Sequence, residues 1–127
     1  KRMMDLTRQS GAYVITHSDG AVRDIIPDLI ETGTQMLNPI QWVCPGMERE
    51  GLKRDFGDRL AFHGAMDNQR ILPFGTVGEV RREVEDNLNT LGSNGGYILA
   101  PCHNIQAVSP VENIVAMYEH VHAVGWY

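Results

Sequence analysis

The chain has few cysteines, no long apolar run and no cluster of basic residues, and each shortage excludes a class of protein. Two cysteines in 127 residues, Cys44 and Cys102, are too few for a disulfide-stapled fold. No apolar run approaches the ~18 residues that a membrane helix needs. Residues 1–5 also lack the apolar core of a signal peptide. We therefore expect a cytoplasmic protein with thiol cysteines and no membrane partner.

The charge balance argues against a nucleic-acid partner. Eleven Lys and Arg stand against 16 Asp and Glu, a formal net charge of −5, and the basic residues are scattered along the chain. Hydrophobic residues make up 43% of the 127, enough for one core. We expect a single domain over residues 1–127 that acts on a small molecule.

Strands and helices alternate along the chain. Apolar strand segments begin near residues 12, 35, 60 and 96, and a segment with helical periodicity follows each. In the first such helix, which ends at Gly33, Pro27 is expected either to kink the helix or to open its second segment. The apolar face of that helix is formed by Val22, Ile25, Ile26, Leu29 and Ile30.

Two of the helices have recognisable start signals. Thr76 followed by Glu79 fits a capping box, and the helix after it keeps an apolar face up to Gly92. Ser109, Pro110 and Glu112 repeat the pattern, with Ser109 expected as the N-cap of a final helix that runs to about residue 124.

Four successive β/α units predict an α/β fold with a parallel sheet. An eight-unit TIM (β/α)₈ barrel takes about 250 residues, so this chain supplies roughly half of one. An isolated half-barrel exposes two strand edges. We therefore expect a homodimer, or association with a separate N-terminal half.

Polar side chains gather where these strands end. The last strand opens on Gly95-Gly96 and ends at Cys102 and His103, and the first runs into His17 and Asp19. Because the carboxyl ends of parallel strands share one edge, we expect one site there. Adjacent strand residues point to opposite faces, so Cys102 and His103 are not both expected to face it, and His103 is favoured.

Other strand-end residues are weaker candidates, and each candidate has a purely structural alternative. His63 is expected to end the third strand and Asp67 to follow it, while Asn38 and Gln41 are placed to reach a substrate. Asn38 can instead serve only an Asn-Pro turn. Asp19 can cap the following helix, and Cys102 can be an inert buried thiol. No role is expected for Cys44, His120 or His122.

Six segments, in this order and spacing, resemble the uroporphyrinogen decarboxylase superfamily. They are His17-Ser18-Asp19-Gly20, Leu37-Asn38-Pro39-Ile40-Gln41, Leu52-Lys53-Arg54-Asp55-Phe56-Gly57, Gly64-Ala65-Met66-Asp67, Gly95-Gly96-Tyr97-Ile98-Leu99-Ala100-Pro101 and Pro110-Val111-Glu112-Asn113. The resemblance covers nearly the whole chain. It implies the C-terminal half, the last four strands, of a (β/α)₈ barrel.

The methyltransferase branch of that superfamily passes methyl groups between corrinoid proteins and thiols such as coenzyme M. It binds zinc through a His-x-Cys pair and a further Cys at the last strand. Here the resemblance places His17-x-Asp19 and Cys102, or alternatively His103, at those positions. Zinc accepts nitrogen, oxygen and sulfur ligands. Asp19, however, stands where the family has a Cys, and so offers a hard oxygen ligand in place of a soft sulfur ligand.

The decarboxylase branch, which serves haem biosynthesis, has a His that matches His103, where it can position or protonate a carboxylated substrate. Its arginines and aspartate lie in an N-terminal half that this chain does not contain. Most arginines of the chain fall in or beside expected helices, where solvated surface is their ordinary setting.

The expected function is one-carbon chemistry. Metal-assisted methyl transfer from a corrinoid to a thiol is the favoured reaction, and uroporphyrinogen decarboxylation is the alternative. His103 and Asp67 are the catalytic candidates, and Asn38 and Gln41 the substrate-binding ones. A catalytically silent half-barrel or assembly module is the alternative from another class. Whether this length of chain is catalytic stays open.

Overall fold

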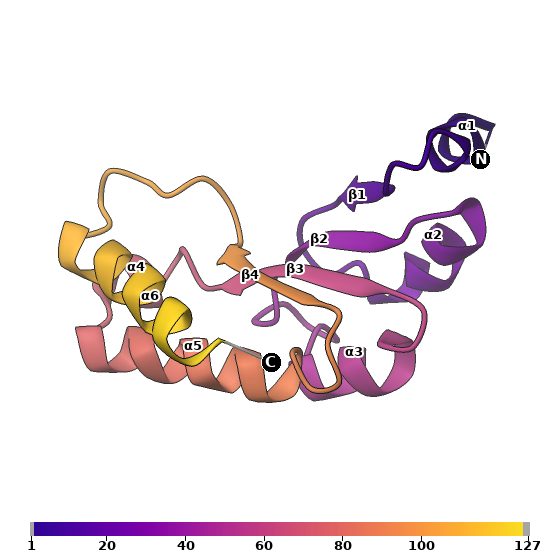
Figure 1. Ribbon diagram of the computed structural model, residues 1–127. Coiled ribbons are helices and arrows are strands. Elements are labelled where there is room, and N and C mark those ends of the chain that lie inside the picture. The colour runs from indigo at the N-terminus through magenta and orange to yellow at the C-terminus, as the bar shows by residue number, and fades with distance from the viewer. Residues whose placement is uncertain (1, 126–127) are drawn as a thin grey trace.

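The computed structural model describes residues 2–125 and has a single four-stranded sheet (Figure 1). All strand pairs are parallel and the strand order is the order of the sequence. The strands are β1 (Ile15–His17), β2 (Met36–Ile40), β3 (Ala61–Met66) and β4 (Tyr97–Pro101). The expected α/β fold of four parallel strands alternating with helices, as in half of a TIM barrel, is confirmed.

Helices connect the strands and lie mainly on one side of the sheet. In Figure 1, α3 and α5 run beneath it, and α6 packs beside α5. A short helix, α4, that the apolar periodicity did not indicate lies between β3 and α5. The helices are α1 (Arg2–Gln9), η1 (Arg23–Ile25), α2 (Ile26–Thr32), α3 (Arg49–Phe56), α4 (Ile71–Phe74), α5 (Val77–Thr90) and α6 (Val111–Val124). None of the helices within residues 2–125 is long and apolar enough to cross a membrane.

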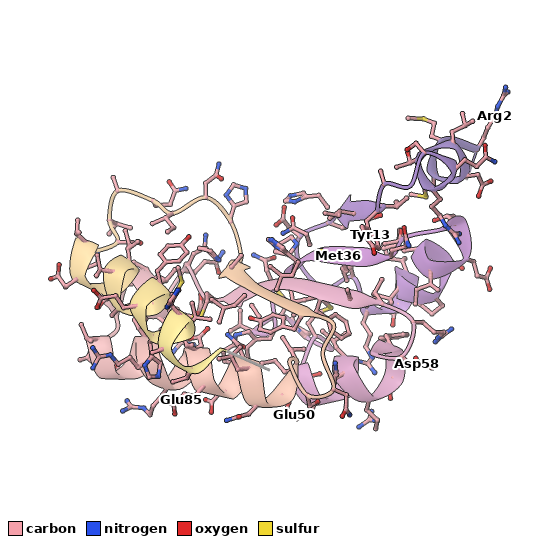
Figure 2. The ribbon with its side chains drawn as sticks, in the orientation of Figure 1. Arg2, Tyr13, Met36, Glu50, Asp58 and Glu85 are labelled. Carbon is pink, nitrogen blue, oxygen red and sulfur yellow. The ribbon has the colours of Figure 1, made fainter. Side chains whose placement is uncertain are left out.

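The two faces of the sheet differ in what covers them. Leu37, Phe62 and Tyr97 occupy one register row, and all three are buried against the helices. The alternate positions point the other way, where Ile15 is 56% and Ile98 48% exposed. Figure 2 shows Met36 on this open side, while Glu50 and Glu85 lie on the outer surface of the helix layer. In a closed barrel the open side would be the interior.

The helix starts agree with the sequence in two cases and differ in one. Thr76 and Glu79 form the expected capping box, and Pro27 lies in the first turn of α2, directly after η1. Ser109 is not an N-cap. Pro110, in an extended conformation, holds that position, so α6 begins one residue later. The amide of Ser109 instead closes a turn onto Gln106 O, and its hydroxyl is buried without a hydrogen bond partner in the described chain.

Candidate active site at the strand ends

Three side chains, one each from β1, β2 and β3, form a continuous hydrogen-bonded row, which we call the His17–Asn38–His63 row. His17 ends β1, but Asn38 and His63 lie within their strands, because β3 continues to Met66 and does not end at His63 as expected. His17 Nδ1 lies 2.6 Å from Asn38 Oδ1, and Asn38 Nδ2 lies 2.6 Å from His63 Nδ1. Because an amide oxygen only accepts and an amide nitrogen only donates, His17 carries a proton on Nδ1 and His63 accepts on its Nδ1. His17 and Asn38 are register partners of β1 and β2, which places the row on the open face of the sheet.

The two histidines at the ends of the row have opposite electrostatic settings. The hydrogen bond that His17 donates to Asn38 raises the pKa of His17, burial opposes this, and the Asp19 carboxylate 3.2 Å from Nε2 raises it further. Burial lowers the pKa of His63. The proton therefore favours the His17 end of the row. Asp19 faces His17 and does not cap the next helix, since Val22 holds the N-cap of η1 with no side-chain bond.

His103 lies beside this row, at a junction of two cavities. Its ring centroid is 6.4 Å from that of His17, with the planes inclined at 67°. The first cavity, of about 490 Å³, is lined by the His17–Asn38–His63 row together with His103 and Tyr118. The second, of about 520 Å³, is lined by His103 with Asp19 and Gln41. Of the expected site residues, His17, Asp19, Asn38 and His103 are therefore brought together.

Cys102 also lines the first cavity, but its thiol is engaged with the backbone of β2. Its side chain is only 4% exposed, and Sγ lies 3.1 Å from Ile40 O, to which it donates. Burial, with a further contribution from the charge of Asp67, raises the pKa of Cys102 to about 12. It is a neutral thiol at physiological pH, whereas a zinc ligand is a thiolate. Within the part of the chain that is described, no three His, Cys, Asp or Glu side chains are grouped to hold a metal ion. The donor set expected for zinc does not converge.

Asp67 and Gln41 organise loops in this structure. Asp67 Oδ1 accepts from the amides of Gln69 and Arg70, which shapes the turn before α4. Gln41 Oε1 accepts from the Gly20 amide at 2.6 Å and so ties the loop after β1 to the loop after β2. Within residues 2–125 neither side chain hydrogen-bonds to the His17–Asn38–His63 row, although Gln41 lines the second cavity with Asp19 and His103.

Sequence reasoning missed a buried carboxylate, Glu83. It reaches from α5 to accept from the Asp67 amide at 2.8 Å and from Trp42 Nε1 at 3.3 Å. Burial raises the pKa of Glu83 in spite of these two donors. Its position three residues after Val80 and next to Val84, on the apolar face of the helix, was the signal that could have found it.

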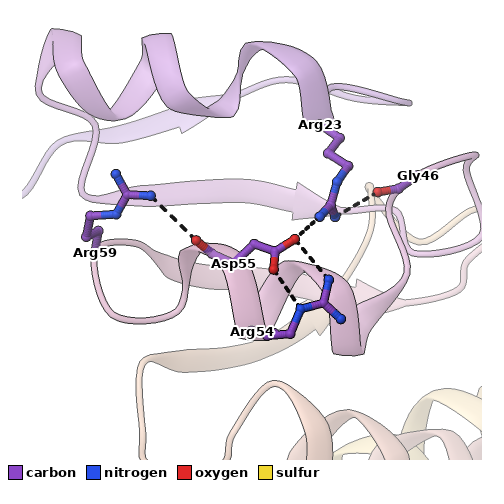
Figure 3. A network of polar contacts seen from close by, with 5 residues as sticks. All are labelled: Arg23, Gly46, Arg54, Asp55 and Arg59. Carbon is purple, nitrogen blue, oxygen red and sulfur yellow. Dashed lines mark hydrogen bonds and ion pairs between the residues drawn. The ribbon is translucent and has the colours of Figure 1, made fainter.

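An arginine network supports the segment that follows Asp19 (Figure 3). Arg23 pairs with Asp55 of α3, donates to Gly46 O at 3.1 Å and lies 5.5 Å from the centre of the Phe56 ring. The expectation of a solvated surface setting is therefore wrong for Arg23, which is partly buried. Arg54, 71% exposed, completes the pair with Asp55 from the solvent side.

These features define half of a (β/α)₈ barrel with polar side chains at the carboxyl ends of its strands. A family model described as uroporphyrinogen decarboxylase (URO-D) matches residues 1–124, so the chain belongs to this family. No curated protein gives a significant match to the chain.

Proposed function

We propose that this domain supplies the acid–base part of a one-carbon site and supports methyl transfer to a thiol. The observation that carries the proposal is the His17–Asn38–His63 row, which places a histidine with a raised pKa at the edge of the 490 Å³ cavity. Family membership supports one-carbon chemistry in general, and the choice of reaction rests on the side chains that line the cavities.

The proton step follows from the hydrogen bonds of His17. In neutral His17 the proton is held on Nδ1 by Asn38. The Nε2 lone pair can accept a proton from an incoming thiol once the Asp19 carboxylate, which lies 3.2 Å from Nε2, turns aside. Proton transfer from sulfur to Nε2 creates a thiolate and an imidazolium, and Asp19 at 3.2 Å stabilises that cation. The thiolate then forms the new carbon–sulfur bond. A corrinoid, when bound, would supply the methyl group and would keep the electron pair of the broken cobalt–carbon bond.

The lining of the cavities favours methyl transfer over porphyrinogen decarboxylation. A porphyrinogen carries several carboxylates, and these need a cationic clamp. The described residues that line the two strand-end cavities include no Arg or Lys. The arginine network lies on helix α3 and the segment after β1 instead.

Zinc remains a separate proposal, and no step is assigned to it because its donors do not converge. His17 Nε2 and Asp19 Oδ2, 3.2 Å apart, are the pair from which a site would have to be built. Elemental analysis after dialysis would then find about one zinc per chain, lost in His17→Ala. Metal-free protein that takes up no added zinc would contradict this, without affecting the proton step.

The direct test is turnover with methylcobalamin and coenzyme M, followed by the absorbance change on demethylation. We expect activity in the wild type, loss in His17→Gln and retention in the control His120→Gln, whose ring pairs with Glu85 on the helix side. Coproporphyrinogen formation from uroporphyrinogen would contradict the choice of reaction. A folded protein inactive in both assays would contradict the proposal and support the silent-module alternative.

A further inference from the structure

The second strand-end cavity has a lining unlike that of the first. Four of its side chains are carboxamides, and they come from the loops that follow three different strands. Around the 520 Å³ space lie Asp19, Gly20, Gln41, Asn68, Gln69, His103 and Gln106. We propose that this cavity binds a primary carboxamide group of the substrate or methyl donor. The inference rests on the proposed function, because it takes the strand-end region to be the ligand-binding site.

Asn68 is a polar side chain that the fold itself does not use. It is 9% exposed, and its Oδ1 atom is buried with no hydrogen bond partner among the described residues. A buried polar atom without a partner lowers stability, so packing alone would favour an apolar residue here. Rotation of the amide by 180° exchanges Oδ1 and Nδ2. Because the Oδ1 position is buried, a ligand in the cavity can reach only the other amide atom, which is the donor Nδ2 in this orientation and the acceptor oxygen after the rotation.

Two neighbouring carboxamides are already held in place at one end. Gln41 Oε1 accepts from the Gly20 amide, which leaves its Nε2 as a donor. Gln106 Nε2 donates to Asn104 O at 3.0 Å, which leaves its Oε1 as an acceptor. The cavity therefore presents a donor and an acceptor that are partly pre-organised. A primary carboxamide, with one acceptor oxygen and two donor hydrogens, matches this set.

The charge of the lining argues for a neutral ligand group. Asp19 is the only carboxylate that lines the cavity among residues 2–125, and it is paired with His17. A ligand carboxylate would find no Arg or Lys among the lining residues to pair with. A ligand cation would find the Asp19 charge partly neutralised by His17. An uncharged amide avoids both costs.

His103 connects this cavity to the proton-transfer region. It lines both cavities, and its ring lies 6.4 Å from the His17 ring. A molecule that spans both cavities would pass His103 between its amide end and its reacting end. The amide contacts would then fix the distance of the reacting group from His17.

Three isosteric planar probes test the charge preference: acetamide, acetate and acetamidinium. Each is titrated into the ¹⁵N-labelled protein at a fixed pH while amide chemical shifts are recorded. We expect acetamide to bind most tightly and to shift the side-chain NH₂ signals of Gln41, Asn68 and Gln69. Asn68→Leu and Gln69→Met should each weaken acetamide by about three- to ten-fold, the loss of one uncharged hydrogen-bonding group. The control Gln9→Met, on helix α1, should not change binding.

Thermal unfolding of Asn68→Leu guards against loss of the fold. We expect a midpoint equal to or above that of the wild type, since a buried atom without a partner is removed. Acetate or acetamidinium binding as tightly as acetamide would overturn the proposal, and so would undiminished acetamide binding in both variants. The readout is binding alone, so it stands apart from methyl transfer. Inactivity of the His17→Gln variant with normal acetamide binding would separate the two proposals.

Discussion

Asn38 joins the histidines of two different strands, since its carbonyl accepts from His17 and its amide group donates to His63, each at 2.6 Å. A single side chain thereby fixes the tautomer of both rings. It also holds the proton of the His17–Asn38–His63 row on His17, the ring that lies next to Asp19. The three side chains meet because of the register of β1, β2 and β3, and each hydrogen bond between them has a fixed donor and a fixed acceptor.

Replacing Asn38 should remove the hydrogen bonds that join the two histidines and should change the pKa of His17. In Asn38→Leu the pKa of His17 should fall, because the hydrogen bond that His17 donates to Asn38 is the largest cause of its elevation. Proton NMR titration of the His17 ring signals measures the change. An unchanged His17 pKa in a folded variant would show that Asn38 does not hold its proton.

Thr76 and Ser109 are both expected from the sequence to cap helices, but alanine substitution should change the free energy of unfolding differently at the two positions. Thr76→Ala should lower the free energy of unfolding by about 1 kcal/mol, because Thr76 caps α5. Ser109→Ala should leave it unchanged or raise it, because the Ser109 hydroxyl is buried without a partner and caps no helix. Urea unfolding of both variants makes the comparison. Equal losses would mean that Ser109 acts as a cap after all.

Glu83 should make stability depend on pH. Its pKa is raised in the folded protein, so its protonated form is favoured by folding. Its contribution is fully present below the unfolded pKa and is lost as pH rises through the folded pKa. Glu83→Gln keeps an acceptor for the Asp67 amide and removes the charge. We expect the variant to be more stable than the wild type at neutral pH, and the advantage to vanish in acid. A constant difference across pH would rule out this titration.

The sheet edges predict self-association. Strands β1 and β4 have no neighbour on their outer sides in the described chain, and Ile15 and Ile98 lie exposed on the open face. A homodimer that closes an eight-stranded barrel would cover the two strand edges and these two side chains. Light scattering of the purified chain should give about twice the mass of one chain, as for a two-fold dimer. A monomer at tens of micromolar would exclude the closed-barrel dimer and leave a separate N-terminal half as the partner.

The alternation of elements could be predicted because its signals are local. The helix ends at Gly33 and Gly57, which are the C-caps of α2 and α3, and the Thr76 capping box are set by neighbouring residues. The residues His17, Asp19 and His103 were predicted at one site because parallel strands end at one edge. Helix α4 is too short for apolar periodicity to reveal it.

The pairing of side chains across strands could not be read in the same way. Asn38 had a sufficient local explanation as a turn residue, and only strand register shows that it contacts His17 and His63. Arg23 likewise depends on a partner 32 positions away, Asp55. Glu83 depends on Trp42, which lies 41 positions away. These contacts are set by tertiary packing, which periodicity along one chain does not encode.

The most direct test of the account is the pH dependence of thiol methylation in the wild type and in Asn38→Leu. If His17 takes the thiol proton, the rate should rise with pH as His17 loses its proton. In Asn38→Leu this rise should move to lower pH, because the His17 pKa falls when the Asn38 hydrogen bond is removed. A rise at the same pH in both proteins, or methylation that persists undiminished in His17→Gln, would contradict the role of His17 as the proton acceptor.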